Sequence, residues 1–192
     1  MKILNEYISY LESKEAPLSA EVVKIRRKNM TVFFDCGSSD EAYEFINSCK
    51  GEKVVVLSHF HEDHSFNSKR LNVTIYCSKY TLKHIDNGQL YKSDEDFIIY
   101  DFPSFHSKGS LALYLPDFKI LFIGDAIYPK GNNLYNLSII NNQIEFINNL
   151  DIEYIAVSHK KQFIFKKNVI LNFLKFIKMS FKKDENIKEI EV

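Results

Sequence analysis

Short apolar runs, separated by polar and turn-forming segments, recur along the whole sequence. Runs of this length that are rich in β-branched and aromatic residues are typical of β-strands. The strands predicted in this way are 17–25, 30–34, 54–57, 73–77, 97–102, 111–115, 119–123 and 152–157. The first two flank a polar turn at 26–29, so together they predict a β-hairpin.

Apolar residues at helical spacing predict helices between several of these strands. The predicted helices are 39–48, 78–85, 141–150 and 166–181. Because strands and helices alternate without an internal repeat or a linker, the pattern predicts a single α/β domain over 1–181. The remaining residues, 182–192, form a mixed-charge tail that we expect to fray.

The last predicted helix is amphipathic, and its apolar face has two interpretations. One side of the helix collects Ile170, Phe173, Leu174, Ile177 and Phe181, whereas the lysines of the segment lie largely elsewhere. Such a helix can cover one face of a sheet while its lysines face water, which is the interpretation we favour. A basic amphipathic helix can also lie on a membrane surface.

Charge and composition exclude several classes of protein. The 192 residues carry 25 Lys plus Arg against 25 Asp plus Glu, and only 3 of the basic residues are Arg. A neutral chain with little Arg argues against a nucleic-acid partner and leaves a small-molecule substrate as the expectation. No apolar run reaches the roughly 18 residues of a membrane-spanning helix. The first residues lack a signal-peptide pattern, so we expect a cytoplasmic protein.

The three cysteines do not form a recognisable metal or redox motif. Cys36, Cys49 and Cys77 are odd in number and lack C-x-x-C spacing. We therefore expect three reduced thiols.

One segment, directly after a buried-type strand, concentrates side chains that bind metals. His59, His61, Asp63 and His64 lie within six positions, as H-x-H-x-D-H. In an extended segment His59 and His61 point the same way, so their imidazoles can bind one ion. Asp63 and His64 can reach past that ion to a second one. Glu62 points to the other side and is assigned no ligand role.

The rest of the sequence supplies further ligands at comparable places. His106, Asp125 and His159 each follow the end of a predicted strand, and a carboxylate such as Asp125 has two oxygens with which to bridge two ions. Strand ends of an α/β sheet gather along one edge, so these side chains are expected to converge. The sixth histidine, His84, lies in a predicted helix, where a surface or packing role is expected.

The order of these residues closely resembles the metallo-β-lactamase superfamily, in which the H-x-H-x-D-H motif is followed by a later His, Asp and His. The resemblance covers about residues 17–159 and includes Phe33-Phe-Asp35-Cys-Gly37, which is similar to the family's strand-ending acidic-small-glycine turn. It implies an α/β fold of the four-layer αβ/βα sandwich type, in a minimal single domain. Two sheets would pack face to face with helices outside, and the metal site would lie at one edge.

The resemblance also implies roles for the seven candidate ligands. The first ion would be held by His59, His61 and His106, the second by Asp63, His64 and His159, and Asp125 would bridge them. Mixed imidazole and carboxylate ligands suit zinc, so two Zn²⁺ ions are expected, although iron or manganese can occupy such sites.

Two such ions about 3.5–4 Å apart lower the pKa of a shared water toward about 7, and the resulting metal-bridging hydroxide attacks a carbonyl carbon or phosphorus. Asp63 is placed to orient this nucleophile or to accept its proton, which makes it the predicted catalytic residue.

The sequence departs from the family pattern near the expected site. Lys108 stands where many members have proline, and Lys160 and Lys161 follow the last histidine where glycine is common. These lysines either favour an anionic substrate at the mouth of the site or are ordinary solvated residues. Tyr128 either donates a hydrogen bond to a developing oxyanion or has only a packing role. The candidate substrate contacts are thus Lys108, Tyr128 and Lys160.

Three functions remain open at this point. The first is a binuclear hydrolase of a small ester-like substrate, a thioester or lactone. It is favoured by the neutral charge and by the 33 residues after His159, too few for the substrate-binding domain of hydroxyacylglutathione hydrolases. The second is a phosphodiesterase or nuclease of the same superfamily, which predicts a basic surface near the site. The third is a non-catalytic metal-binding module. The oligomeric state is not predicted.

Overall fold

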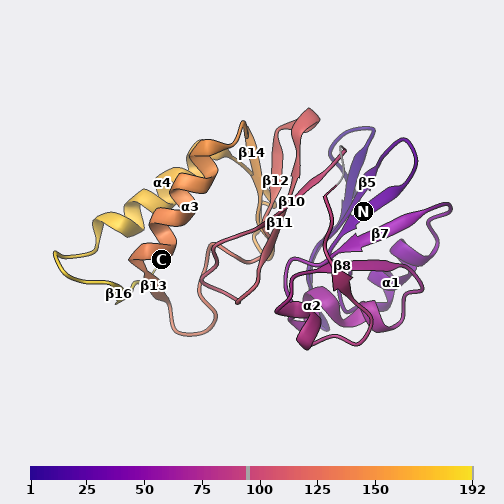
Figure 1. Ribbon diagram of the computed structural model, residues 1–192, viewed down its shortest axis with the longest axis horizontal. Helices are drawn as coiled ribbons and strands as arrows, with labels where there is room; N and C mark the ends of the chain where they lie inside the picture. Colours follow the sequence, from indigo (N-terminus) through magenta and orange to yellow (C-terminus); the bar gives the residue numbers. More distant parts are fainter. Residues whose placement is uncertain (94–95, 192) are drawn as a thin grey trace.

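The computed structural model of the chain describes residues 1–93 and 96–191 and contains two main β-sheets (Figure 1). The first sheet has seven strands in the order β1 (Lys2–Ile3), β2 (Ile8–Leu11), β5 (Val22–Arg26), β6 (Thr31–Phe34), β7 (Lys53–Val56), β8 (Thr74–Cys77) and β9 (Gln89–Leu90). The second sheet has five strands in the order β10 (Ile98–Asp101), β11 (Leu111–Leu115), β12 (Ile120–Phe122), β14 (Tyr154–Ala156) and β15 (Ile164–Lys166). Two small antiparallel pairs are formed by β3 (Lys14–Glu15) with β4 (Leu18–Ser19), and by β13 (Leu134–Asn136) with β16 (Ile187–Glu189).

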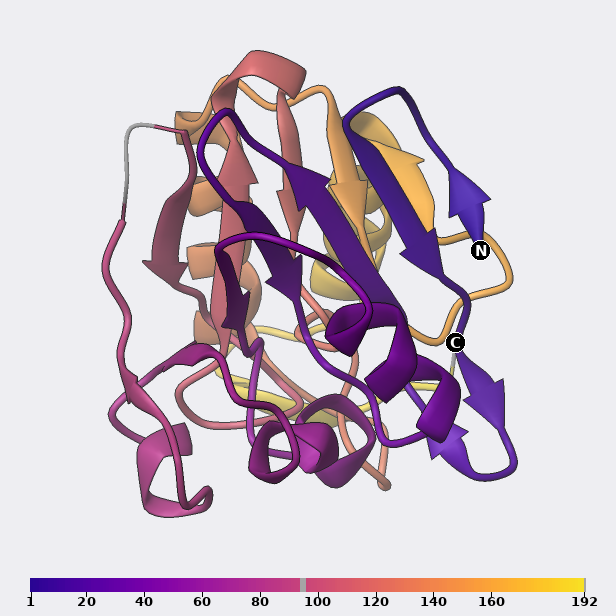
Figure 2. The same cartoon turned by 90° about the vertical axis from the view of Figure 1, so that its right-hand side faces the viewer.

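The helices cover the outer faces of the two sheets. Helix α1 (Asp40–Asn47) and the short α2 (Glu62–Ser65) accompany the first sheet, whereas α3 (Leu137–Asn149) and α4 (Lys167–Met179) pack together outside the second (Figure 1). Figure 2, which looks onto the first sheet, shows the second sheet and its helices behind it. This arrangement is the predicted four-layer αβ/βα sandwich, so the fold class is confirmed. Within the described residues, no helix has the length and apolar character needed to cross a membrane.

Three apolar layers hold the four structural layers together. Val54 and Val56 of β7 belong to the core between the two sheets, whereas Val55 faces α1 on the other side. This alternation follows from the two-residue period of a strand. Because both faces of β7 are covered, every residue of its apolar run is buried on one side or the other. The third layer joins the second sheet to α3 and α4, through residues such as Ile140 and Leu174.

Strand direction brings the loops with metal-binding residues to one edge. Strands β6 and β7 are parallel, and so are β12 and β14. Strand β10 runs antiparallel to β11, which in turn runs antiparallel to β12, so β10 and β12 point the same way. The segments after β10, β12 and β14 therefore leave the second sheet on the same side, and their metal-binding side chains meet those of the segment after β7, as the sequence predicts.

Some predicted elements differ from the structure in their bounds. Helix α3 begins at Leu137 rather than at 141, because the side chain of Asn136 caps it by accepting the backbone N–H groups of Ser138 and Ile139 at 2.9 and 3.3 Å. The predicted helix 78–85 contains only the 3-10 turn Thr81–Lys83. The predicted strand 17–25 is interrupted, with β4 and β5 on either side of residues 20–21.

Two regions outside the predicted elements are ordered strands. The N-terminal strands β1 and β2 extend the first sheet, with Ile8 of β2 opposite Ile25. In the C-terminal tail, β16 pairs with β13, and the Lys188 ammonium donates to the Ser180 carbonyl at the end of α4. The expectation that the tail frays is therefore wrong for residues 187–189, because backbone pairing with a distant strand offsets the weak apolar character of this segment.

Candidate metal centre

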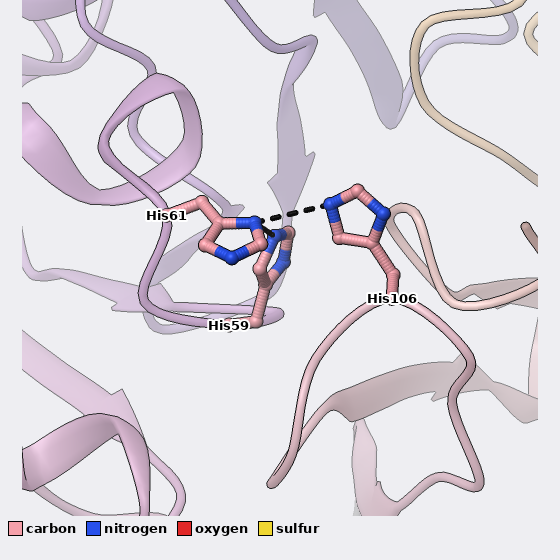
Figure 3. Close-up of side chains that lie close together, drawn as sticks. All are labelled: His59, His61 and His106. Carbon is pink, nitrogen blue, oxygen red and sulfur yellow. Dashed lines mark hydrogen bonds between the residues drawn. The ribbon is translucent and has the colours of Figure 1, made fainter. Parts of the chain in front are cut away.

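All seven predicted ligands meet at the shared edge of the two sheets, in two groups. The first group is His59, His61 and His106, and the second is Asp63, His64, Asp125 and His159. Within each group the candidate ligand atoms lie within 4.8 Å of one another. Figure 3 shows the three imidazoles of the first group turned toward one another, two from the loop after β7 and one from the loop after β10.

The first group brings three ring nitrogens to one point. The Nδ1 atom of His61 lies 2.9 Å from Nε2 of His59 and 3.0 Å from Nε2 of His106. His61 is the N-cap of α2 and has an extended backbone, as the alternation of the motif predicts.

The second group is arranged around the carboxylate of Asp125. The Oδ2 atom of Asp125 lies 3.2 Å from Nε2 of His64 and 3.9 Å from Nε2 of His159. The same oxygen lies 3.3 Å from Nε2 of His106, which belongs to the first group. Asp63 completes the second group, with its Oδ2 2.9 Å from Nε2 of His159. One oxygen of Asp125 therefore lies between the two groups, in the position of a bridging ligand.

The residues fit a pair of divalent ions. Ligands about 2.0–2.1 Å from a tetrahedral zinc ion lie about 3.3 Å apart, close to the separations in both groups. Three of the candidate ligand residues have a buried side-chain atom with no hydrogen-bond partner among the described residues. These atoms are Nε2 of His64, Nδ1 of His106 and Oδ1 of Asp125. An unpartnered nitrogen of His64 beside two carboxylates is the arrangement that a cation would satisfy.

A buried hydrogen-bond network behind the ligands fixes the tautomer of His59. The Oδ2 atom of Asp35 lies 2.8 Å from the Ser58 hydroxyl, which in turn lies 2.9 Å from Nδ1 of His59. Since a carboxylate only accepts, Ser58 donates its single proton to Asp35 and accepts from Nδ1–H of His59. The lone pair of His59 Nε2 then faces the first group, as a metal ligand requires.

Asp35 also orients a ligand of the second group. Its Oδ2 accepts from Nδ1 of His64 at 2.7 Å, and its Oδ1 accepts the backbone N–H of Ser58 at 2.7 Å. Asp35 is completely buried and has a φ of 60°, a left-handed conformation that costs a non-glycine residue free energy. This buried carboxylate thus supports one ligand in each group.

The last ligand, His159, is held by a residue from the opposite sheet. His159 has a φ of 56°, and its backbone N–H donates to Oε2 of the buried Glu21 at 3.1 Å. Glu21 directly precedes β5 in the first sheet, so this bond ties the turn after β14 to the other half of the sandwich.

The first group is electrostatically prepared to bind a cation as neutral imidazoles. Burial, together with the other imidazoles, lowers the pKa of His59 well below its usual value. Burial, His106 and Lys130 lower the pKa of His61 to about 4. Burial likewise lowers the pKa of His106. Neutral imidazoles expose lone pairs, so these three residues need not lose a proton at neutral pH in order to bind metal.

The second group has the opposite character. Burial by itself would lower the pKa of His64, but the carboxylates of Asp125 and Asp35 raise it well above its usual value. Burial opposes the shift of His159 in the same way, while Asp63 and Asp125 raise its pKa. Despite burial, the neighbouring histidines lower the pKa values of Asp63 and Asp125. In the metal-free protein, protons on the histidines therefore balance ionised carboxylates where a cation would bind.

The ligands open into a cavity of about 990 Å³, and the predicted substrate contacts are placed differently around it. Tyr128 lines the cavity, but its hydroxyl donates to the Ser158 carbonyl at 3.1 Å, so its proton is not free for an oxyanion. The Lys160 ammonium lies 4.3 Å from the Tyr128 ring centroid. Lys108 and Lys160 are exposed and are not among the residues that line the cavity.

Two lysines that were not predicted as substrate contacts do line the cavity, namely Lys14, which forms an ion pair with Glu41, and Lys130. The Lys130 ammonium lies 3.2 Å from Nε2 of His61, on the side of the ring that faces away from the other two imidazoles. Its position between Pro129 and Gly131, in the loop after Asp125, is the signal that could have identified it.

Asp35 and Glu21 were also missed as supporting residues. Asp35 ends a strand parallel to the one that carries the motif, so the rule that strand ends converge applies to it as well. Glu21 has no comparable signal, because its partner, His159, lies 138 positions away in sequence.

Two residues that were assigned no metal role lie outside both groups. His84 is exposed and stacks on Phe60 with ring centroids 4.2 Å apart. Glu62 is exposed at the rim of the cavity. The three cysteines are free thiols, as expected.

Comparisons with known proteins agree with this architecture. No protein-family model matches the sequence, and a search of the curated proteins finds no match. Among solved structures, VMB-1 superposes with a TM-score of 0.71 at 18% identity, over 93% of this chain and 95% of VMB-1. The metallo-β-lactamase DIM-1 gives a TM-score of 0.67 at 16% identity, over 92% of this chain and 96% of that enzyme. A peroxy diiron form of the chemotaxis sensor ODP gives 0.65 at 17% identity, over 92% of this chain and 93% of ODP.

At such low identity these neighbours show the fold alone. They include a β-lactamase and a diiron sensor, so the metal and the reaction differ among proteins of this shape. The superpositions on VMB-1 and DIM-1 nevertheless extend over 92–93% of this chain and 95–96% of those proteins. The chain therefore has the metallo-β-lactamase fold, and the predicted resemblance to that superfamily is confirmed at the level of the fold.

Proposed function

We propose that this protein is a metal-dependent hydrolase that binds two Zn²⁺ ions and cleaves a small ester-like substrate, a thioester or lactone, that carries negative charge. The observation that carries the proposal is the position of Asp125, whose Oδ2 lies 3.3 Å from His106 of one ligand group and 3.2 Å from His64 of the other. The fold and the His/Asp cluster fit a metal-dependent hydrolase.

The seven ligands would hold the two ions, with Asp125 between them. Bound divalent ions supply a nucleophile from water at neutral pH and polarise the attacked group. The chain itself contributes a carboxylate that stays ionised, because the hydrogen bond from His159 lowers the pKa of Asp63 against the effect of burial. Asp63 lines the cavity, so it can orient a donor bound there or accept its proton.

The position of Lys130 supports the proposal that the substrate is negatively charged. Its ammonium lies on the cavity wall beside His61, where it can pair with a carboxylate or a phosphate of a bound molecule. This lysine is also the observation that favours a second candidate, a phosphodiesterase, since a phosphodiester carries its charge at the reacting group.

A hydrolysis panel tests the proposal. Zinc-loaded protein should hydrolyse thioesters or lactones in preference to bis-p-nitrophenyl phosphate. His59→Ala and Asp63→Asn should each lower kcat/KM by about 10²–10⁴-fold. His84→Ala is the matched control, because this histidine lies outside both ligand groups and should keep full activity.

Other outcomes would point elsewhere. Phosphodiester cleavage that depends on His59, without thioester or lactone turnover, would replace the substrate class with that of the second candidate. Stoichiometric binding of two ions without hydrolysis of any substrate would favour a metal-binding module. Elemental analysis, with activity measured after loading zinc, iron or manganese, distinguishes zinc from the alternatives.

A further inference from the structure

Charge is strongly segregated along a chain whose net charge is zero. Residues 154–183 contain eight lysines and no Asp or Glu. This segment comprises β14, the turn with His159, β15 and the whole of α4. Within the described part of the chain, none of the eight lysines forms an ion pair; Lys160 packs on Tyr128, and Lys167 donates to the Leu150 carbonyl. Their positive charge is therefore available to a partner.

The outer face of α4 adds large apolar side chains to this charge. The inner face of the helix buries residues such as Ile170, Leu174 and Ile177 against the second sheet and α3. On the outer side, Phe176 is 65% exposed and Met179 is 83% exposed. Neither side chain is needed to cover the core, so exposing them has a cost unless something else covers them.

Lysines lie next to these apolar residues in the helix. Lys175 and Lys178 are exposed and neighbour Phe176 and Met179 in sequence. In the turn that follows α4, Glu185 is already engaged by the Lys182 backbone N–H and by the Lys188 ammonium. An exposed Phe and Met among unpaired lysines is the pattern of a helix that inserts apolar side chains between lipids while its lysines bind the headgroups.

We propose that the outer face of α4 docks this protein on an anionic phospholipid membrane. In this orientation Phe176 and Met179 enter the acyl boundary, and Lys175 and Lys178 pair with lipid phosphates and carboxylates. No residue of α4 lines the cavity at the metal centre, so the proposed docking uses none of the residues that line it.

A second copy of the chain fits this face less well. A helix of 13 residues is about 20 Å long and about 10 Å wide, so its outer face covers about 200 Å². A stable protein interface needs about 800 Å² per partner. A symmetric contact would also place the lysines of the two copies against each other without acidic partners.

Vesicle binding tests the proposal with the zinc-loaded protein of 192 residues. The protein should co-sediment with vesicles of phosphatidylcholine containing about 30% phosphatidylserine but not with pure phosphatidylcholine, and added salt should weaken binding. Because the chain has no Trp, Phe176→Trp introduces a single reporter whose emission should shift to the blue with the anionic vesicles.

Variants of exposed residues identify the face that binds. The double variants Phe176→Ser/Met179→Ser and Lys175→Glu/Lys178→Glu should each weaken binding by at least about tenfold. Two double variants elsewhere on the surface are matched controls. Ile3→Ser/Leu90→Ser replaces side chains that are 70% and 53% exposed, and Lys28→Glu/Lys50→Glu replaces two exposed lysines. Both controls should bind like the wild type. Thermal unfolding verifies that all variants fold.

Several results would overturn the proposal. These are equal binding to both kinds of vesicle, no binding to either, or full binding by the α4 variants. A dimer in size-exclusion chromatography that the Phe176→Ser/Met179→Ser variant converts to a monomer would assign the face to a second copy instead. Hydrolysis by the soluble protein is measured separately, so failure here is distinguishable from failure of the proposed function.

Discussion

At the scale of single residues, Asp35 connects the two ligand groups although it belongs to neither. Its buried carboxylate accepts from His64 directly and from Ser58, which in turn accepts from His59. Hydrogen-bond partners behind metal ligands fix the tautomer and direction of the ring and make it a better ligand. One carboxylate therefore influences both candidate ion sites.

We expect Asp35→Asn to weaken metal binding by about 10–100-fold while the chain still folds. An amide that places its NH₂ at the Oδ2 position cannot accept from His64 and Ser58 together, so both rings lose their orientation. Competition with a chromogenic chelator measures the affinity. Asp40→Asn is the control, since this exposed aspartate pairs with Arg70 at the surface and lies outside both ligand groups. An unchanged affinity in the Asp35 variant would contradict the orienting role.

The ligands were predictable residue by residue, whereas the residues that support them were not. Each ligand is a polar side chain placed just after an apolar run, and its type limits what chemistry it can do. The role of Glu21 depends on one backbone N–H on the opposite sheet, which no local pattern encodes. The Tyr128 hydroxyl has the right chemistry for an oxyanion donor, but the Ser158 carbonyl accepts its proton. Contacts between distant segments decide such cases.

At the scale of elements, α3 links the loops of two ligands through one buried side chain. The Nε2 atom of Gln143 donates to the Pro103 carbonyl at 2.7 Å and to the Ala126 carbonyl at 2.9 Å. Pro103 lies three residues before His106, and Ala126 directly follows Asp125. The helix therefore holds these two ligand loops at a constant separation.

Replacing this amide by a hydrocarbon should loosen both loops. We expect Gln143→Leu to lower the free energy of unfolding by about 1–3 kcal/mol, because two carbonyls lose their donors in a buried site. Urea unfolding measures this change, and metal titration should show weaker binding as well. Gln162→Leu is the matched control, since Gln162 is exposed and donates to the carbonyl of Ile164, two residues away. Equal stability of the two variants would show that Gln143 does not hold the loops.

Element type was predicted more reliably than element bounds. Long apolar runs such as β11 leave little choice, because all five of its residues are buried. The start of α3 depends on the cap by Asn136, which the apolar spacing over 141–150 does not indicate. The short strand β16 contains a single apolar residue, Ile187, and forms because its backbone pairs with β13. Pairing between distant segments overrides local propensity in such places.

At the scale of the whole molecule, the metal centre joins the two halves of the sandwich. Residues 1–93 contribute His59, His61, Asp63 and His64, whereas residues 96–191 contribute His106, Asp125 and His159. Each ligand group contains residues from both halves. Bound ions would therefore crosslink the two sheets at one edge, where Glu21 and His159 already form a hydrogen bond.

Metal binding should accordingly stabilise the whole fold. A ligand present at a hundred times its dissociation constant adds about 2.7 kcal/mol to the free energy of unfolding, if it binds only the native state. For a chain of this length, that corresponds to a rise in Tm of about 5–10 °C. Differential scanning fluorimetry with and without a chelator measures the difference, and His59→Ala/Asp63→Asn should abolish it.

The size of this stabilisation should increase with pH. In the metal-free protein the pKa values of His64 and His159 are raised. Their protonated forms therefore stabilise the fold fully below the pKa of an unfolded histidine, about 6.5. This contribution is lost as the pH rises through the pKa values of the folded state. The pKa values of Asp63 and Asp125 are lowered, so their ionised forms stabilise the fold above the pKa of an unfolded aspartate, about 4. This contribution is lost as the pH falls through the pKa values of the folded state.

Ions must displace the protons of His64 and His159, so metal and protons compete for the second group at mildly acidic pH. The first group does not compete in this way, since burial keeps the pKa of His61 at about 4. Lowering the pH from about 8 to about 6 should therefore shrink the rise in Tm and release one of the two ions first. Elemental analysis after dialysis at each pH counts the ions. Simultaneous loss of both ions, or a larger rise in Tm at the lower pH, would show that the two groups do not differ in this way.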